Sequence, residues 1–201
     1  MNLNTQTLIW TMAIVGIIIL VGFFIWKKQS SNDDNPKALN GAVSRILRGY
    51  CVLRDTQVVS NVNLQYQNQT IHIDHMMIGA FGILLIGNLY SKGEVYGSLT
   101  DKKLVVSKDK VKKYIENPYA KQLEHTEFLR NYFAKSKIYR VIFESIVVYT
   151  GNEKNTPIFF DHEQKIVRLS ALKAYINKVK FEKNNGVEVQ KVIDAIEQIK
   201  I

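Results

Sequence analysis

The chain has 201 residues, a single cysteine and a formal net charge of +9. This length leaves room for one soluble domain of ordinary size and a short extra segment. The lone Cys51 excludes an internal disulfide. The basic charge favours nucleic acid or an anionic membrane surface as a partner, and the alternative is a lysine-rich surface that only faces solvent.

Residues 8–26 form an almost unbroken apolar run, and no charged side chain precedes Lys27. A helix of this length spans about 28 Å, close to the thickness of a bilayer core. Trp10 and Trp26 stand near its ends, where aromatic rings favour the membrane interface. The run predicts a transmembrane helix rather than a cleaved signal peptide, because residues 1–7 carry no positive side chain and no small-residue cleavage site follows.

The charges beside the apolar run predict its orientation. Lys27 and Lys28 follow it directly, so the positive-inside rule places residues 1–7 outside the cell and the C-terminal domain in the cytosol. Residues 27–36 are polar and read as a tether to a domain over residues 37–201. We therefore expect a single-pass protein of the cell membrane.

The first half of the domain predicts one helix followed by strands. Asn35 and Pro36 resemble an N-cap with proline at the first helical position, and the helix extends to about Gly49. Alternating or continuous apolar runs predict strands at residues 52–53, 58–65, 70–79, 82–89, 94–97 and 104–106. The run at 82–89 is apolar throughout, as in a central strand that is buried on both faces.

The second half predicts more helices than strands. Asn117 and Pro118 begin a helix that extends to about Ala134, Ser170 caps another that ends near Val179, and residues 187–199 form an amphipathic one. Strands are expected at residues 141–149, 158–160 and 166–169. The fold class is therefore α/β (α+β), with a central mixed β-sheet flanked by helices.

Asp74 is the acidic residue of a predicted strand, and alternation places His72 on its face and His75 on the other. Two side chains do not make a metal site, so no zinc is expected there. The region 102–113 contains six lysines, which predict either a stripe that contacts phosphates or a solvated surface: Lys102, Lys103, Lys108, Lys110, Lys112 and Lys113. Walker, GxGxxG, GxSxG and HExxH motifs do not occur.

Several short motifs occur together in residues 39–149. They include Ile73-Asp74-His75, the apolar run at 82–86, Gly93-Glu94-Val95-Tyr96-Gly97, Asn117-Pro118 and His125. In this combination the chain resembles the nuclease-related domain, NERD, which is related to the PD-(D/E)xK nucleases. The resemblance implies a PD-(D/E)xK-like fold and a relation to nucleases that hydrolyse phosphodiesters with a bound metal.

The catalytic positions that the resemblance implies are mostly lost. The glutamate of the first helix falls near Asn40, the glutamate of Glu-x-Lys falls on Gly87, and its lysine falls on Leu89. Asp74 is the remaining family residue. One carboxylate holds Mg²⁺ weakly, because hydrolysis of this type needs several carboxylates around the metal. We therefore expect no catalytic residue, metal or cofactor, and Mg²⁺ only if other residues have taken over.

Three functions follow as hypotheses. The first is a membrane protein whose inactive NERD domain binds, scaffolds or regulates, with nucleic acid as one possible ligand. The second is an active membrane-tethered nuclease whose catalytic residues have migrated, with Lys92 and Glu94 as substitutes. The third is a protein that contacts anionic lipid headgroups or a protein partner with its basic face.

Overall fold

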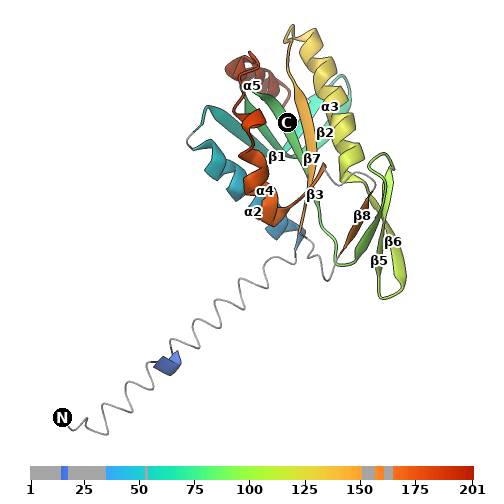
Figure 1. The fold of residues 1–201 in the computed structure, drawn as a ribbon. Coiled ribbons are helices and arrows are strands. Elements are labelled where there is room, and N and C mark those ends of the chain that lie inside the picture. Colours follow the sequence, from blue (N-terminus) through green and yellow to red (C-terminus); the bar gives the residue numbers. More distant parts are fainter. Residues whose placement is uncertain (1–14, 18–34, 53, 151–156, 161–164) are drawn as a thin grey trace, which may run out of the picture.

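The computed structural model describes residues 15–17, 35–52, 54–150, 157–160 and 165–201 (Figure 1). Its helix α2 (Pro36–Cys51) begins at the Asn-Pro pair, as the sequence predicts. The Asn35 side chain accepts the Lys37 backbone N–H at 3.0 Å, and Pro36 occupies the first turn. Helix α3 (Pro118–Lys135) begins the same way, with Asn117 accepting from the Tyr119 N–H at 3.0 Å. Asn117 also donates to the carbonyl oxygens of Ser98, Leu99 and Asp101, which fixes the start of the helix to the loop at residues 98–101.

The described strands form two sheets. The first has five strands in the order β1 (Thr56–Tyr66), β2 (Gln69–Gly79), β3 (Gly82–Leu89), β7 (Phe143–Tyr149) and β9 (Ile166–Arg168). β1, β2 and β3 pair antiparallel, whereas β3, β7 and β9 pair parallel, so the sheet is mixed as expected. The second has four strands in the order β6 (Val111–Glu116), β5 (Lys103–Lys108), β4 (Glu94–Gly97) and β8 (Ile158–Phe160).

Two connections fix the register of the first sheet. Gln67 and Asn68 both adopt left-handed φ angles, 47° and 62°, and make a two-residue hairpin turn between β1 and β2. Gly82 begins β3 at a φ of 126°, and a Cβ there would lie 2.2 Å from the Ile142 carbonyl oxygen. Glycine is therefore required where β3 meets the chain that leads into β7.

Helices cover both faces of the five-stranded sheet (Figure 1). On one face α3 and α5 (Val189–Gln198) bury Leu129, Phe133 and Ile196. On the other, α2 and α4 (Leu169–Ile176) bury Val43, Leu47 and Leu172, and the 3-10 helix η2 (Val179–Phe181) follows α4. The inner face of the four-stranded sheet packs on a third cluster around Leu89, Val95 and Tyr149. The mixed α/β class is thus confirmed.

Several details of the prediction were wrong. Residues 52–53 were expected in a strand, but α2 continues past Gly49 because Tyr50 packs into the core, and Val52 caps it with helical dihedrals; Leu53 lies outside the described residues. Ser170 is inside α4, whose N-cap is Arg168 without a side-chain hydrogen bond. Strand β6 was not predicted, and the strands at 94–97, 104–106 and 158–160 belong to a separate sheet.

Among the residues that the structure describes, no helix is long and apolar enough to cross a membrane. The predicted span at residues 8–26 lies outside the described residues, apart from residues 15–17. The tether at 27–36 is described from Asn35 onward.

Candidate functional site

Strands β2 and β3 separate at Asp74. Their antiparallel pairing ends at His75 and Ile86, while β3 stays paired with β7 as far as Leu89. One residue beyond the last β2–β3 pair, the Asp74 carboxylate accepts the Asn88 backbone N–H at 2.9 Å. The side chain therefore takes the place of a ladder carbonyl, and the two strands diverge from this point like a fork.

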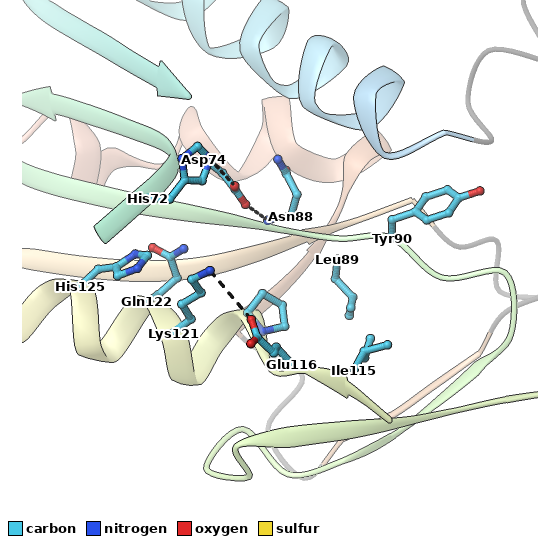
Figure 2. Close-up of a pocket in the computed structure, with 11 residues that line it drawn as sticks. His72, Asp74, Asn88, Leu89, Tyr90, Ile115, Glu116, Lys121, Gln122 and His125 are labelled. Carbon is cyan, nitrogen blue, oxygen red and sulfur yellow. Dashed lines mark hydrogen bonds and ion pairs between the residues drawn. The ribbon is translucent and has the colours of Figure 1, made fainter. Parts of the chain in front are cut away.

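A cavity of about 250 Å³ opens at this fork (Figure 2). β2 and β3 form one wall, the start of α3 forms the opposite wall, and the end of β6 closes one side. The lining residues are His72, Asp74, Asn88, Leu89, Tyr90, Ile115, Glu116, Pro118, Lys121, Gln122 and His125. The structure thus brings Asp74 and Leu89, two positions singled out from the sequence, to one site.

Asp74 already has polar neighbours on both carboxylate oxygens. One oxygen accepts from Asn88, and the other lies 3.7 Å from His72 Nε2. The other ring nitrogen of His72 lies 2.8 Å from the side-chain oxygen of Asn63 on β1. These contacts give Asp74 a local structural role at the fork.

Asn40 reaches the same region from α2. The Asn88 side-chain amide donates to Asn40 Oδ1 at 3.3 Å and to His75 Nε2 at 3.2 Å. Burial, with a smaller contribution from Arg48, lowers the pKa of His75 to about 4, so its ring is neutral at physiological pH. Because His75 Nε2 accepts from Asn88, the ring proton lies on Nδ1, which is 3.0 Å from the Ser60 hydroxyl.

Gly87 faces α3 rather than open space. A Cβ built there would lie 2.9 Å from Gln122 Nε2 and 3.4 Å from Pro118 Cβ. Gln122 is only 2% exposed, so its amide fills the space into which a longer side chain at position 87 would extend. Leu89 is 3% exposed and packs in the third apolar cluster, where a lysine would lose its hydration.

His125 lies one turn after Gln122 on the cavity wall (Figure 2). Burial is the main cause that lowers its pKa to about 4, and the nearby Lys121 and His72 act in the same direction. His125 Nδ1, Gln122 Oε1 and Asn88 Oδ1 are buried and have no hydrogen-bond partner among the described residues. The inner part of the cavity therefore presents neutral polar groups beside the Asp74 carboxylate, and Glu116 and Lys121 line its edge.

The charged groups at the edge of the cavity do not form a set of metal ligands among the described residues. Glu116 pairs with Lys121 at 3.9 Å, and its side chain is 81% exposed. Within the described ranges, no three His, Cys, Asp or Glu side chains lie close enough to hold a metal ion. The hypothesis that this domain carries no metal stays a prediction.

The six lysines of residues 102–113 lie on or beside the β5–β6 hairpin, and all of them are exposed. Asp109 and Lys110, with φ angles of 50° and 66°, make its turn. Lys108, Lys110, Lys112 and Lys113 therefore gather near the tip. Lys102 and Lys103 lie at the other end, in a hollow that they share with Glu116 and Lys121.

Lys92 and Glu94, the proposed substitutes, are not among the residues that line the cavity. Glu94 lies on β4 opposite Ser107, where its carboxylate accepts the Tyr96 hydroxyl. The sequence prediction missed Asn88 and Gln122. Each leaves a weak signal in the sequence. Asn88 is a polar residue in an apolar strand, and Gln122 precedes His125 by three positions on the helix face that also carries the buried Leu129.

Comparison with known proteins identifies a family for most of the folded part. A family match to the nuclease-related domain, NERD, covers residues 37–150, which is more than half of the chain. No curated protein matches the chain, and no solved structure matches it. The match includes α2, the strands of the fork and α3. The chain therefore belongs to the nuclease-related domain family.

Proposed function

We propose that this protein is a membrane-tethered NERD domain that binds nucleic acid without cleaving it. The observation that carries the proposal is the fork: Asp74 is bonded to the Asn88 N–H, and Gly87 beside it is packed against Gln122. On this proposal the chain keeps the nuclease-related fold, with the uncharged Asn40, Gly87 and Leu89 at the positions where the resemblance implies charged residues.

The chemistry of hydrolysis supports the inactive part of the proposal. Mg²⁺ binds through several oxygen ligands, and cleavage needs the metal to hold both the scissile phosphate and the attacking water. At the fork, the Asn40 side chain is uncharged and accepts a hydrogen bond from Asn88, and Leu89 is buried in an apolar cluster. Asp74 alone leaves a metal with mostly water ligands, and Lys121 at the edge of the cavity is paired with Glu116 instead of standing beside Asp74.

The hairpin supports the binding part. Four of its lysines lie near the tip, and Lys102 and Lys103 line a separate hollow that shares Glu116 and Lys121 with the cavity at the fork. Contacts of this kind neutralise phosphates without reading sequence. Affinity should therefore depend strongly on salt and weakly on sequence.

A salt titration tests this proposal. Fluorescence anisotropy with the full-length chain in detergent should show that log affinity falls linearly with log salt. A variant that combines Lys108→Gln, Lys110→Gln, Lys112→Gln and Lys113→Gln should show a flatter slope of log affinity against log salt. The change should correspond to the loss of up to about four phosphate contacts. The matched control is a second quadruple variant that replaces four lysines outside the hairpin and should leave most of the slope intact: Lys135→Gln, Lys137→Gln, Lys183→Gln and Lys191→Gln. Binding that ignores salt and the hairpin lysines would contradict the proposal.

The membrane part of the proposal rests on the uncharged run at 8–26 and on Lys27 and Lys28 after it. Alkaline extraction should leave the full-length protein in the membrane fraction, and a reporter fused after Ile201 should report a cytosolic C-terminus. A soluble product that lacks the first 26 or so residues would contradict the tether.

A further inference from the structure

A row of side chains crosses the outer face of the four-stranded sheet. Strand register aligns Tyr114 on β6 with Val105 on β5, Val105 with Tyr96 on β4, and Tyr96 with Phe159 on β8. Neighbouring residues of the same strands, such as Val95 and Leu104, point the other way into the apolar cluster below. We call Tyr114, Val105, Tyr96 and Phe159 the aromatic row.

The aromatic row is open to solvent. Tyr114 is 68% exposed, Phe159 is 51% exposed and Tyr96 is 37% exposed. The Tyr96 and Phe159 rings stack with centroids 4.8 Å apart and planes 13° apart, and the Glu94 carboxylate accepts the Tyr96 hydroxyl. Large exposed aromatic rings in one line add little to the core and are typical of a binding surface.

The spacing within the row leaves room for a flat group. Tyr96 and Tyr114 are separated by two strand spacings, roughly 9.6 Å, and the short Val105 lies between them. A nucleic-acid base is flat and apolar on both faces, and successive bases stack at about 3.4 Å. A single base stacked on both rings would need a gap of about 6.8 Å and two bases about 10.2 Å, so the space above Val105 suits one base against each ring.

Charge indicates which flat ligand is favoured. Lys112 and Lys103 lie on the same outer face as the row, one on each side of Tyr114 and Val105, and Lys108 and Lys110 lie at the adjoining hairpin tip. Glu94 and Glu116 share this face, but each has a partner, in Tyr96 and Lys121. Aromatic rings bordered by lysines fit a chain whose bases are apolar and whose phosphates are negative.

We propose that the aromatic row stacks unpaired bases of a single-stranded nucleic acid whose phosphates contact the hairpin lysines. The inference rests on the proposed nucleic-acid binding and adds its strand class. A duplex keeps its bases paired and stacked internally, so it offers phosphates to the lysines but no open base face to the row.

The test compares two probes on the full-length chain in detergent by fluorescence anisotropy. The probes are a labelled oligo-dT of about 15 nucleotides and a blunt duplex of the same length. The wild type should bind the single strand at least tenfold more tightly. Tyr96→Leu with Phe159→Leu should weaken that binding about tenfold or more and leave duplex binding unchanged. Tyr139→Leu, which removes a 68% exposed tyrosine outside the sheet, is the matched control and should change neither.

Further variants separate stacking from loss of structure. Tyr96→Phe keeps the ring and loses the hydroxyl, so it should bind the single strand as the wild type does. The Leu variants should unfold at the wild-type temperature, because the replaced rings are exposed. Weaker binding by a Leu variant that has also lost its thermal transition does not count as support. In that case Tyr114→Leu alone should still weaken oligo-dT binding and leave duplex binding unchanged.

The outcomes distinguish this inference from the proposed function. If neither probe binds, the proposed function itself is wrong. If both probes bind equally and the Leu variants change nothing, the lysines bind nucleic acid and the stacking inference is overturned. If the Leu variants lose binding to phosphatidylserine vesicles while they retain oligo-dT binding, the row is a lipid-contacting surface and the inference is also overturned.

Discussion

The Asp74 carboxylate accepts a hydrogen bond from the backbone N–H of Asn88 at 2.9 Å, just beyond His75 and Ile86, the last paired residues of β2 and β3. The residue that the family resemblance makes a catalytic remnant is therefore part of the sheet's own hydrogen bonding. It satisfies a backbone donor at the point where the two strands diverge. Asp74 therefore has a structural role at the fork that requires no metal.

Replacing Asp74 should affect stability before it affects any chemistry. Asp74→Ala leaves the Asn88 N–H without its acceptor, which should cost about 1 kcal/mol and lower the melting temperature by about 2–4 °C. Asp74→Asn keeps an acceptor oxygen and should cost less. Urea denaturation of the three proteins measures the difference, and it should be the same with and without millimolar Mg²⁺. Stabilisation of the wild type alone by Mg²⁺ would show that Asp74 holds a metal.

The packing of Gly87 against Gln122 predicts a coupled pair. Gly87→Ala places a Cβ 2.9 Å from Gln122 Nε2, so it should destabilise the domain by about 1–2 kcal/mol. In a Gln122→Ala background the same change should cost much less, because the obstructing amide is gone. A double-mutant cycle by urea denaturation gives the coupling energy. Additive effects would mean that the two side chains do not compete for this space.

The same contact affects any attempt to place charged residues at the three positions that the resemblance makes catalytic. Asn40→Glu, Gly87→Glu and Leu89→Lys together would place a glutamate against Gln122, so the triple variant should fold poorly unless Gln122→Ala is added. Calorimetric titration with Mn²⁺ should then detect binding in the quadruple variant and none in Gln122→Ala alone. Failure of the folded quadruple variant to bind Mn²⁺ would contradict the assignment of these positions.

Buried His75 predicts a loss of stability in mild acid. Its pKa is about 4 in the folded protein and 6.5 as its ordinary value, so between these pH values the unfolded chain binds more protons than the folded one. Stability is therefore highest above pH 6.5 and falls as the pH drops toward 4, by about 3 kcal/mol from this residue. His75→Gln cannot take up that proton, so its unfolding free energy should vary less over the same range. An unchanged pH slope in His75→Gln would show that His75 is not the group responsible.

The elements that could be predicted from the sequence are those with a strong local signal. Asn35-Pro36 and Asn117-Pro118 mark helix starts because the asparagine side chain caps the first turn and proline needs no donor there. The apolar run at 82–89 matches β3 at both ends, since a central strand must be apolar on both faces. The position of Asp74 beside Gly87 and Leu89 follows from the pairing of these strands.

The missed features depend on tertiary contacts. β6 has mostly exposed side chains and two lysines, and it is a strand because β5 pairs with it along its whole length. The separation of the strands into two sheets cannot be inferred from alternation, which reports faces and not partners. Asn88 and Gln122 owe their contacts to the fork and to the packing of α3 against β3, and the weak signal that each leaves in the sequence does not indicate what it contacts.

The most direct test of the account follows binding and cleavage in one sample. The full-length chain is incubated at low salt with end-labelled single-stranded DNA and millimolar Mg²⁺ or Mn²⁺, and the DNA is examined for retardation and, after denaturation, for length. A domain that binds without cleaving should give retarded DNA of unchanged length, and Asp74→Ala should give the same result. Metal-dependent shortening that disappears in Asp74→Ala, and also in Glu94→Gln with Lys92→Ala or in Glu116→Gln with Lys121→Gln, would contradict the proposed function and identify an active nuclease with relocated catalytic groups.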